Sequence, residues 1–420
     1  MAKRRGKLPE WQRNLRVLWF GNFMSGIGFS LIMPFMSLYI DTLGDFNRTE
    51  LSFWSGLTFA ATFLVTAVVS PIWGRLADER GRKLMLLRAS LGMAIVIACM
   101  GLVTDVYQLV LLRLLQGVFA GYISNANALI ATTAPREQSG QALGTLTTGN
   151  VSGTLLGPLV GGAIAEVVGY RVTFFVTGGL LLLVFFLSLF MVHEHFTPIK
   201  RADAVPMKRV FHELKYPHVI IGMFVTTMFI QASNNSISPI LSLYVRQLMG
   251  GRGGIAFISG IIASLPGVAT LLVAPRFGRL GERIGTEKIL LIGLAFAVLV
   301  YISQAFVTNV WQLGFLHFLV GIADAALIPQ VQTLLAKYSP HYAAGRIFSY
   351  NQSFQATGNV AGPLIGSTIS GAFSYFAVFL STSLLVLVNL VWVNFSTQEI
   401  RGLEFLVLES ISIPKVLGPF

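Results

Sequence analysis

Long apolar stretches alternate with short polar segments along almost the whole chain. Because about 20 consecutive apolar residues suffice to cross the hydrocarbon core of a bilayer, each stretch predicts a membrane-spanning helix. We expect twelve such spans, at residues 15–40, 51–73, 84–103, 106–133, 140–167, 172–192, 219–245, 255–277, 289–307, 310–336, 343–370 and 373–395. The predicted fold class is therefore an all-α membrane protein.

The longest polar segment between two spans covers residues 193–218 and divides six spans from six. The chain is thus expected to consist of a first six-helix lobe (1–192), a cytoplasmic linker (193–218), a second six-helix lobe (219–396) and a cytoplasmic tail (397–420). The basic start of the chain could imitate a secretory signal, but the apolar stretch after it is too long. We interpret that stretch as the first retained span.

Three separate motifs recur at almost the same spacing, which indicates that the two lobes are repeats of one unit. The matching pairs are 34–39 with 239–244 at an offset of 205, Pro71 and Gly74 with Pro275 and Gly278 at an offset of 204, and 153–161 with 358–366 at an offset of 205. Parallel repeats of this kind are related by an axis along the membrane normal. A central pathway between the two lobes is the expected consequence.

Composition excludes a water-soluble chain. Hydrophobic residues make up 54% and charged residues 11% of the sequence, whereas about 25% of the residues of a soluble globular protein are charged. The net charge of +12 could suggest nucleic-acid binding in a soluble protein, but 25 of the 30 Lys and Arg residues lie at one end of the predicted spans. The positive-inside rule then places both termini in the cytoplasm. With Cys99 as the single cysteine, neither an intrachain disulfide nor a cysteine-based zinc site is expected.

A dense charged segment, residues 74–84, lies between the second and third spans and predicts a tight turn at the membrane surface. Gly74 and Gly81 would let two helix ends approach closely. Asp78 and Arg82 are four residues apart, so they would face each other if the turn is helical.

Three motifs resemble the major facilitator superfamily. Residues 74–84 resemble its loop signature between the second and third helices, residues 113–121 resemble its fourth-helix motif, and residues 153–162 resemble the fifth-helix motif associated with drug and proton antiporters. The resemblance covers nearly the whole chain. It implies the major facilitator fold, with twelve transmembrane helices in two pseudo-symmetric six-helix lobes, and a bacterial multidrug efflux transporter that works by alternating access and is coupled to protons.

The resemblance also implies a conformational latch that holds the outward-facing state and is made by Gly74, Asp78, Gly81 and Arg82. The alternative is a surface charge pair that fixes topology, worth under about 1 kcal/mol.

The fifth-helix motif predicts a gating helix. Its residues are Gly153, Gly157, Pro158, Gly161 and Gly162. Glycines four residues apart allow close helix packing in lipid, and a proline bends the helix. The alternative is ordinary packing of small residues.

Ionisable side chains in and beside the spans are candidates for proton coupling. Asp324 lies mid-span in the tenth helix, where burial favours its neutral form until water or a cation reaches it. His317, seven residues earlier, lies on a similar face of that helix. Arg113 lies inside the fourth span, where a cation costs roughly 2.5 to 3.5 kcal/mol. Asp41 and Glu166 fall at external span ends and could receive protons there. Structural hydrogen bonding, or simple exposure for Asp41 and Glu166, is the alternative for each.

Neutral polar and aromatic residues scattered through the spans predict a wide substrate cavity. The candidates are Asn22, Phe29, Tyr122, Asn125, Gln231, Asn234, Tyr244, Gln330 and Gln355. A pocket of this kind suits varied amphiphilic cations, because it imposes no rigid set of hydrogen bonds.

Enzyme motifs such as a phosphate loop or a His-Glu-x-x-His metal pair are missing from the sequence. We therefore expect a secondary transporter without cofactor or metal, with the proton as coupling ion. The expected partners are lipophilic drugs such as fluoroquinolones and dyes, protons and membrane lipids, but not nucleic acid. We expect a monomer in the bacterial cell membrane. The alternatives are a nutrient-uptake or lipid-translocating transporter of the same superfamily, and a membrane sensor, against which the short loops argue.

Overall fold

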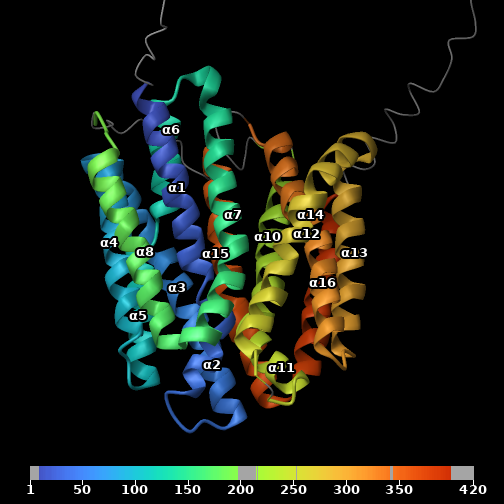
Figure 1. The fold of residues 1–420 in the computed structure, drawn as a ribbon. Coiled ribbons are helices and arrows are strands. Elements are labelled where there is room, and N and C mark those ends of the chain that lie inside the picture. Colours follow the sequence, from blue (N-terminus) through green and yellow to red (C-terminus); the bar gives the residue numbers. More distant parts are fainter. Residues whose placement is uncertain (1–8, 197–213, 215, 252, 341–343, 399–420) are drawn as a thin grey trace, which may run out of the picture.

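The computed structural model describes residues 9–196, 214, 216–251, 253–340 and 344–398. The first lobe contains the helices up to Met191 (Figure 1). They are α1 (Glu10–Ser30), η1 (Met33–Phe35), α2 (Met36–Asp41), α3 (Arg48–Arg80), α4 (Arg82–Met100), α5 (Val106–Phe119), α6 (Tyr122–Thr133), α7 (Arg136–Val168) and α8 (Tyr170–Met191).

The second lobe begins at Pro217. Its helices are α10 (Pro217–Ile237), α11 (Leu241–Leu248), α12 (Ile255–Ile284), α13 (Thr286–Ala305), α14 (Val310–Tyr338), α15 (Ala344–Ala372) and α16 (Tyr375–Ser396). Most of the predicted linker, 193–218, and nearly all of the tail, 397–420, lie outside the described residues.

Within the described residues, ten helical stretches are long and apolar enough to cross a membrane. The other two predicted spans correspond to α10 with α11 and to α15. Amide side chains interrupt the apolar sequence of these two, as Gln231 and Asn234 do in α10 and Gln352 and Gln355 do in α15. All twelve predicted spans are thus helical, as the sequence predicts.

Three spans are divided where the sequence predicts continuous helices. The first is split into α1, η1 and α2 around Pro34, the fourth is split at Ala120 and Gly121, and the seventh is split into α10 and α11 around Pro239. Gly121 has φ +114°, a conformation that favours glycine. The break therefore has a cause that can be read from the residue type.

The charged segment 74–84 does not form the separate turn that the sequence predicts. Helix α3 continues to Arg80, and α4 begins at Arg82, so that the reversal takes place at Gly81 alone, whose φ is +95°. Asp78 and Arg82 consequently belong to different helices, and the i,i+4 geometry of one helix does not apply to them.

The same glycine contacts recur in both lobes. Gly153 of α7 packs directly on the backbone of Phe23 in α1, and its counterpart Gly358 of α15 packs on Met228 in α10. These pairs are related by the offset of 205 found in the sequence. The repeat is therefore a structural repeat.

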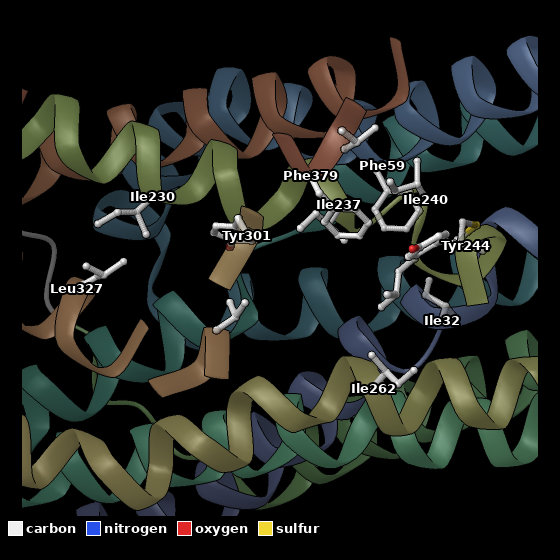
Figure 2. Close-up of a cluster of buried hydrophobic side chains, with 14 of the residues drawn as sticks. Ile32, Phe59, Ile230, Ile237, Ile240, Tyr244, Ile262, Tyr301, Leu327 and Phe379 are labelled. Atoms are coloured by element: carbon white, nitrogen blue, oxygen red, sulfur yellow. The ribbon is translucent and has the colours of Figure 1, made fainter. Parts of the chain in front are cut away.

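The lobes meet at one end of the bundle, where α2 and α11 lie together at the bottom of Figure 1. We call this the closed end, and the opposite end, where α1 begins and α16 ends, the terminal end. Helix α3 packs on α15 and helix α7 packs on α12. A buried apolar cluster continues across this contact and includes Ile32 and Phe59 of the first lobe with Ile240 and Ile262 of the second (Figure 2).

Candidate functional site

Asp324 lies in the second lobe and ends a short chain of hydrogen bonds that involves α10 and α13. Its Oδ1 accepts a hydrogen bond from Asn234 Nδ2 of α10 at 3.0 Å, and Asn234 Oδ1 accepts one from the Tyr301 hydroxyl of α13 at 2.9 Å. Asp324 is partly buried. It lines a cavity of about 10 Å³, which is room for about one water molecule. The Asp324 carboxyl group thus has a hydrogen-bond partner and room for a water molecule, within a cavity lined mainly by apolar side chains.

His317 lies two turns earlier on α14 and is buried. Its Nδ1 lies 3.2 Å from Gln304 Nε2 of α13. Gln304 and Tyr301 are three residues apart on α13 and therefore lie on one face of that helix. The contact of His317 with Gln304 and the hydrogen bonds of Asn234 with Asp324 and Tyr301 are thus neighbours along the interface between α13 and α14. The structure brings the two candidates to the same interface, where each bonds a different partner.

Arg113 is completely buried in the first lobe, between α5 and α3. Its Nε donates to Thr58 O at 3.0 Å and its Nη1 to Gln116 Oε1 at 2.7 Å, while Thr62 Oγ1 donates to the Arg113 carbonyl at 2.9 Å. Its Nη2 has no partner within the described structure. The Arg113 side chain therefore joins α5 to α3, and its Nη2 group remains an unused hydrogen-bond donor in the described structure.

Asp41 and Glu166 both bridge the two lobes at the closed end. Asp41 pairs with Arg246 of α11, and Glu166 Oε1 accepts a hydrogen bond from the Gly254 N–H at 2.8 Å. Both acids therefore hold inter-lobe contacts, a role that their position at span ends does not reveal.

Most of the predicted cavity residues bond within their own lobe. Tyr122 bonds Ser188 at 2.9 Å, Asn125 donates to Gly121 O at 2.7 Å, Tyr244 donates to Val307 O at 3.2 Å, Gln330 donates to Phe277 O at 3.3 Å, and Asn234 bonds Asp324. Asn22 is buried, and both polar atoms of its side chain are unpaired in the described structure. Phe29, Gln231 and Gln355 remain partly exposed. The structure does not gather these nine side chains around one described cavity.

The predicted gating helix divides into two sets of contacts. Gly153, Gly157 and Gly161 face α1 of the same lobe. Gly162 packs on the backbone of Ala256 in α12, and Gly260 of α12 packs on Pro158. Only Pro158 and Gly162 therefore take part in the interface between lobes, whereas the three other glycines serve packing within the first lobe.

The predicted latch surrounds a carboxylate that the sequence analysis does not single out. Glu194 follows α8 and accepts hydrogen bonds from the Arg82 N–H at 2.8 Å and the Lys83 N–H at 2.7 Å. A carboxylate at this position satisfies the first N–H groups of α4 and interacts favourably with its helix dipole. Among the described residues, no atom beyond the local helix backbone lies within 4 Å of a Cβ placed on Gly74. The side chain of Asp78 lies outside the described residues.

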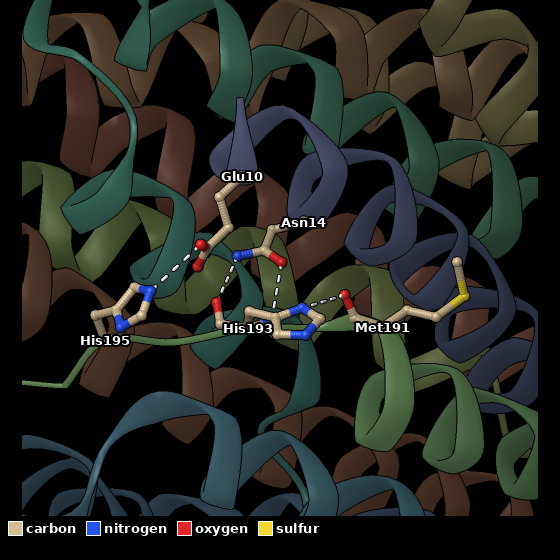
Figure 3. Close-up of polar contacts among 5 residues, drawn as sticks. All are labelled: Glu10, Asn14, Met191, His193 and His195. Atoms are coloured by element: carbon tan, nitrogen blue, oxygen red, sulfur yellow. Dashed lines mark hydrogen bonds and ion pairs between the residues drawn. The ribbon is translucent and has the colours of Figure 1, made fainter. Parts of the chain in front are cut away.

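The start of α1 and the end of α8 are joined beside this cap (Figure 3). Asn14 Nδ2 donates to His193 O at 2.6 Å and Asn14 Oδ1 accepts from the His193 N–H at 3.0 Å. His195 lies 3.3 Å from Glu10. These contacts fix the segment that carries Glu194.

Arg88 and Trp73 hold the break in the fourth span. Arg88 Nη1 donates to Val118 O at 3.0 Å and its Nη2 to Ala120 O at 2.8 Å, while Trp73 Nε1 donates to Val118 O at 2.8 Å. The guanidinium lies 3.9 Å from the centre of the Trp73 ring, a cation–π contact. Carbonyl groups freed by the break are thereby satisfied, a role that the sequence gives no reason to expect of Arg88.

A larger cavity of about 260 Å³ lies at the terminal end, between the first turns of α1 and α7. Trp11, Arg16, Gln138 and Gln141 are among the residues that line it. None of the predicted site residues is part of this cavity.

A family model described as Major Facilitator Superfamily matches residues 18–259 and 223–401. Multidrug resistance protein MdtG of Serratia proteamaculans is 54% identical over 386 residues, which are 92% of this chain and 94% of that protein. The protein of the same name from Escherichia fergusonii is 53% identical over 382 residues, 91% of this chain and 94% of that protein.

Solved structures share the fold. A bacterial homologue of the human lysosomal transporter Spinster, in an inward-facing and occupied conformation, matches with a TM-score of 0.78 at 16% identity, covering 94% of this chain and 98% of that one. The human organic anion transporter MFSD10 matches with a TM-score of 0.64 at 17% identity, covering 92% and 100%.

Proposed function

Because the chain belongs to the Major Facilitator Superfamily, we propose that it is a multidrug efflux transporter driven by the proton gradient. It is a multi-pass membrane protein and a transporter, not an enzyme. The relatives named above are multidrug resistance proteins, and they match over more than nine-tenths of the chain. The proposed substrates are lipophilic, often cationic drugs and dyes, and the proposed location is the bacterial cytoplasmic membrane with both termini inside.

The observation that supports proton coupling is the chain of hydrogen bonds that runs from Tyr301 through Asn234 to Asp324. A carboxylate among amide and hydroxyl groups can take up a proton or pair with a substrate cation, but it cannot do both at once. Competition of this kind links export of a cation to import of a proton. In the proposed cycle, an external proton displaces the drug from Asp324 and is released to the cytoplasm after the lobes reverse.

The energy of this exchange is sufficient for useful export. One charge that moves down a membrane potential of 100 mV releases about 2.3 kcal/mol. At about 1.36 kcal/mol per decade, this supports roughly a fifty-fold substrate gradient. The proposed transporter therefore needs no nucleotide.

The closed end faces the outside in this proposal. The positive-inside rule puts the terminal end, with most of the Lys and Arg residues, in the cytoplasm. The conformation described here would then be open toward the cytoplasm. Alternating access requires a second conformation, in which the contacts at the closed end separate.

The test is ethidium efflux driven by an imposed proton gradient in proteoliposomes, with wild type, Asp324→Asn and Asp45→Asn. The amide in Asp324→Asn keeps the size and a hydrogen-bonding oxygen of the carboxyl group but cannot carry the proton, so gradient-driven efflux is expected to fall at least ten-fold. Asp45 is an exposed loop acid, and its variant is expected to remain within two-fold of wild type. Undiminished efflux by Asp324→Asn would remove Asp324 from the mechanism, and uncoupler-insensitive efflux by wild type would exclude the proton as energy source.

A further inference from the structure

An ion pair at the closed end joins the two lobes. Asp41 ends α2 of the first lobe, and its carboxylate contacts the Arg246 guanidinium in α11 of the second. The side chains remain 31% and 37% exposed, respectively, so the pair can open and close without leaving a buried charge.

Asp41 and Arg246 are counterparts in the internal repeat. They are 205 residues apart, and the flanking segments 34–39 and 239–244 match at the same offset. Each residue therefore occupies, in its own lobe, the position that the other occupies in the partner lobe. A contact between two equivalent positions lies on the pseudo-two-fold axis that relates the lobes.

Two hydrogen bonds flank this pair and are themselves counterparts. Glu166 accepts from the Gly254 N–H, and Thr49 Oγ1 donates to Gly371 O at 2.8 Å. At the offset of 205, Glu166 corresponds to Gly371 and Thr49 corresponds to Gly254. The contacts at the closed end thus have nearly symmetric geometry, although their chemistry differs on the two sides.

Two tyrosines, Arg48 and Glu166 are among the described side chains near the pair. Tyr170 at the start of α8 and Tyr375 at the start of α16 lie within electrostatic range of both Asp41 and Arg246. Arg48 stacks over the Tyr375 ring at 4.6 Å, and Glu166 is the other acid within range of Tyr170. One aromatic ring from each lobe therefore stands beside the pair, as the repeat requires.

We propose that Asp41 and Arg246 form an ionic clasp on the pseudo-two-fold axis, which sets the balance between the conformation closed at this end and the one open at this end. The proposal rests on the alternating access proposed above. Asp41 acts here as a positioning residue through its charge, and drug and proton bind elsewhere. A contact that exists in only one of two conformations shifts their ratio by its own interaction energy.

Neutralising either Asp41 or Arg246 is expected to shift the ratio of the two conformations about two- to five-fold toward the state open at this end. This range corresponds to the interaction energy of partly exposed ion pairs in general. Because the positions are equivalent, the exchanged pair Asp41→Arg with Arg246→Asp is expected to restore the ratio to within two-fold of wild type. An ordinary interface pair in an asymmetric environment has no reason to tolerate this exchange.

The experiment measures distances between spin labels in a Cys99→Ala background. One label pair replaces Thr42 and Gln247, exposed counterparts next to the clasp, and the other replaces Leu84 and Lys288, exposed counterparts at the terminal end. Opening of the clasp is expected to increase the first distance and to decrease the second. Asp41→Asn, Arg246→Gln, the double neutral variant and the exchanged pair are compared, and Asp41→Glu with Arg246→Lys serves as a conservative pair expected to resemble wild type.

The single and double neutral variants are expected to shift the distances equally, since the second change removes nothing further. Unchanged distances in Asp41→Asn and Arg246→Gln would overturn the clasp, and so would an exchanged pair that behaves like the single variants. The distances are compared between variants without substrate and at one fixed pH, so the comparison tests neither the substrate nor the coupling ion. Loss of efflux in wild type would therefore refute the proposed function, whereas a failed exchange refutes only the clasp.

Discussion

Arg113 and His317 occupy equivalent positions in the two lobes, 204 residues apart. The helices around them make matching contacts: Gly117 packs on the backbone of Thr62, and its counterpart Gly321 packs on Pro266. Thr66 and Thr270 donate in the same manner to the carbonyl groups of these glycines. One fold position thus carries a permanent cation in the first lobe and an imidazole in the second.

Arg113→Gln is expected to destabilise the protein more than His317→Gln. Loss of the bonds from the guanidinium to Thr58 O and Gln116 is expected to cost about 1–3 kcal/mol, because bonds to charged groups are strong. Glutamine at 317 can keep the contact with Gln304, so a cost under about 1 kcal/mol is expected there. Denaturant unfolding in detergent micelles measures both, and equal effects would show that the cation is not the tie between α3 and α5.

Gly260→Val is expected to prevent the conformation described here. A Cβ at residue 260 would meet the backbone of Pro158 in α7, so that a larger side chain keeps the lobes apart at the closed end. We expect efflux to fall more than ten-fold, with a normal yield of folded protein. Gly179→Val is the control, since no atom of the described residues beyond the local helix backbone lies within 4 Å of a Cβ there. Wild-type efflux in Gly260→Val would mean that α7 and α12 need not approach this closely during transport.

The sequence predicts the lobes and the glycine contacts because both follow from a regular pattern. Apolar stretches identify the spans, and the offset of 205 relates Gly153 to Gly358 before any contact is known. The pair of Asp41 and Arg246 obeys the same offset, but at span ends these residues look like ordinary loop charges. Only the approach of α2 to α11, which depends on how the lobes meet, turns them into partners.

Other parts of the site could not be predicted because their partners lie on helices whose contacts the sequence does not give. Tyr301 lies in an apolar span and looks like a packing residue until Asn234 is seen beside it. Glu194 lies in the predicted linker, where an acid is normally solvated. Its role depends on the end of α8 reaching the start of α4.

Glu194→Gln is expected to weaken the cap of α4. The amide retains one acceptor for the two N–H groups of Arg82 and Lys83 but loses the negative charge at the helix start. For a partly exposed group the expected cost is about 0.3–1 kcal/mol. Hydrogen exchange of the amides of 82–85 should accelerate accordingly, while Glu79→Gln, at an exposed position on α3, should leave them unchanged. Unaltered protection in Glu194→Gln would show that the backbone geometry at Gly81 suffices to start the helix.

The break in the fourth span is a difference between the two lobes. Ala120, the residue before Gly121, corresponds at the offset of 204 to Asp324 in the continuous helix α14. Arg88, which satisfies the carbonyl groups at the break, corresponds to Ile292, which is exposed on α13. The break and its arginine are thus found together in the first lobe, whereas the second lobe has an acid and an unbroken helix.

Arg88→Lys is therefore expected to loosen the break without unfolding the lobe. An ammonium group cannot reproduce the fork that reaches Val118 O and Ala120 O together, and it stacks less well on Trp73. The loss of one strong bond is expected to cost about 1–2 kcal/mol and to increase hydrogen exchange at 119–125 about ten-fold, with little change in α14. Arg276→Lys, at an exposed position, is the matched control. If residues 119–125 keep their protection in Arg88→Lys, Gly121 alone determines where the helix is interrupted, and the guanidinium merely occupies the space beside it.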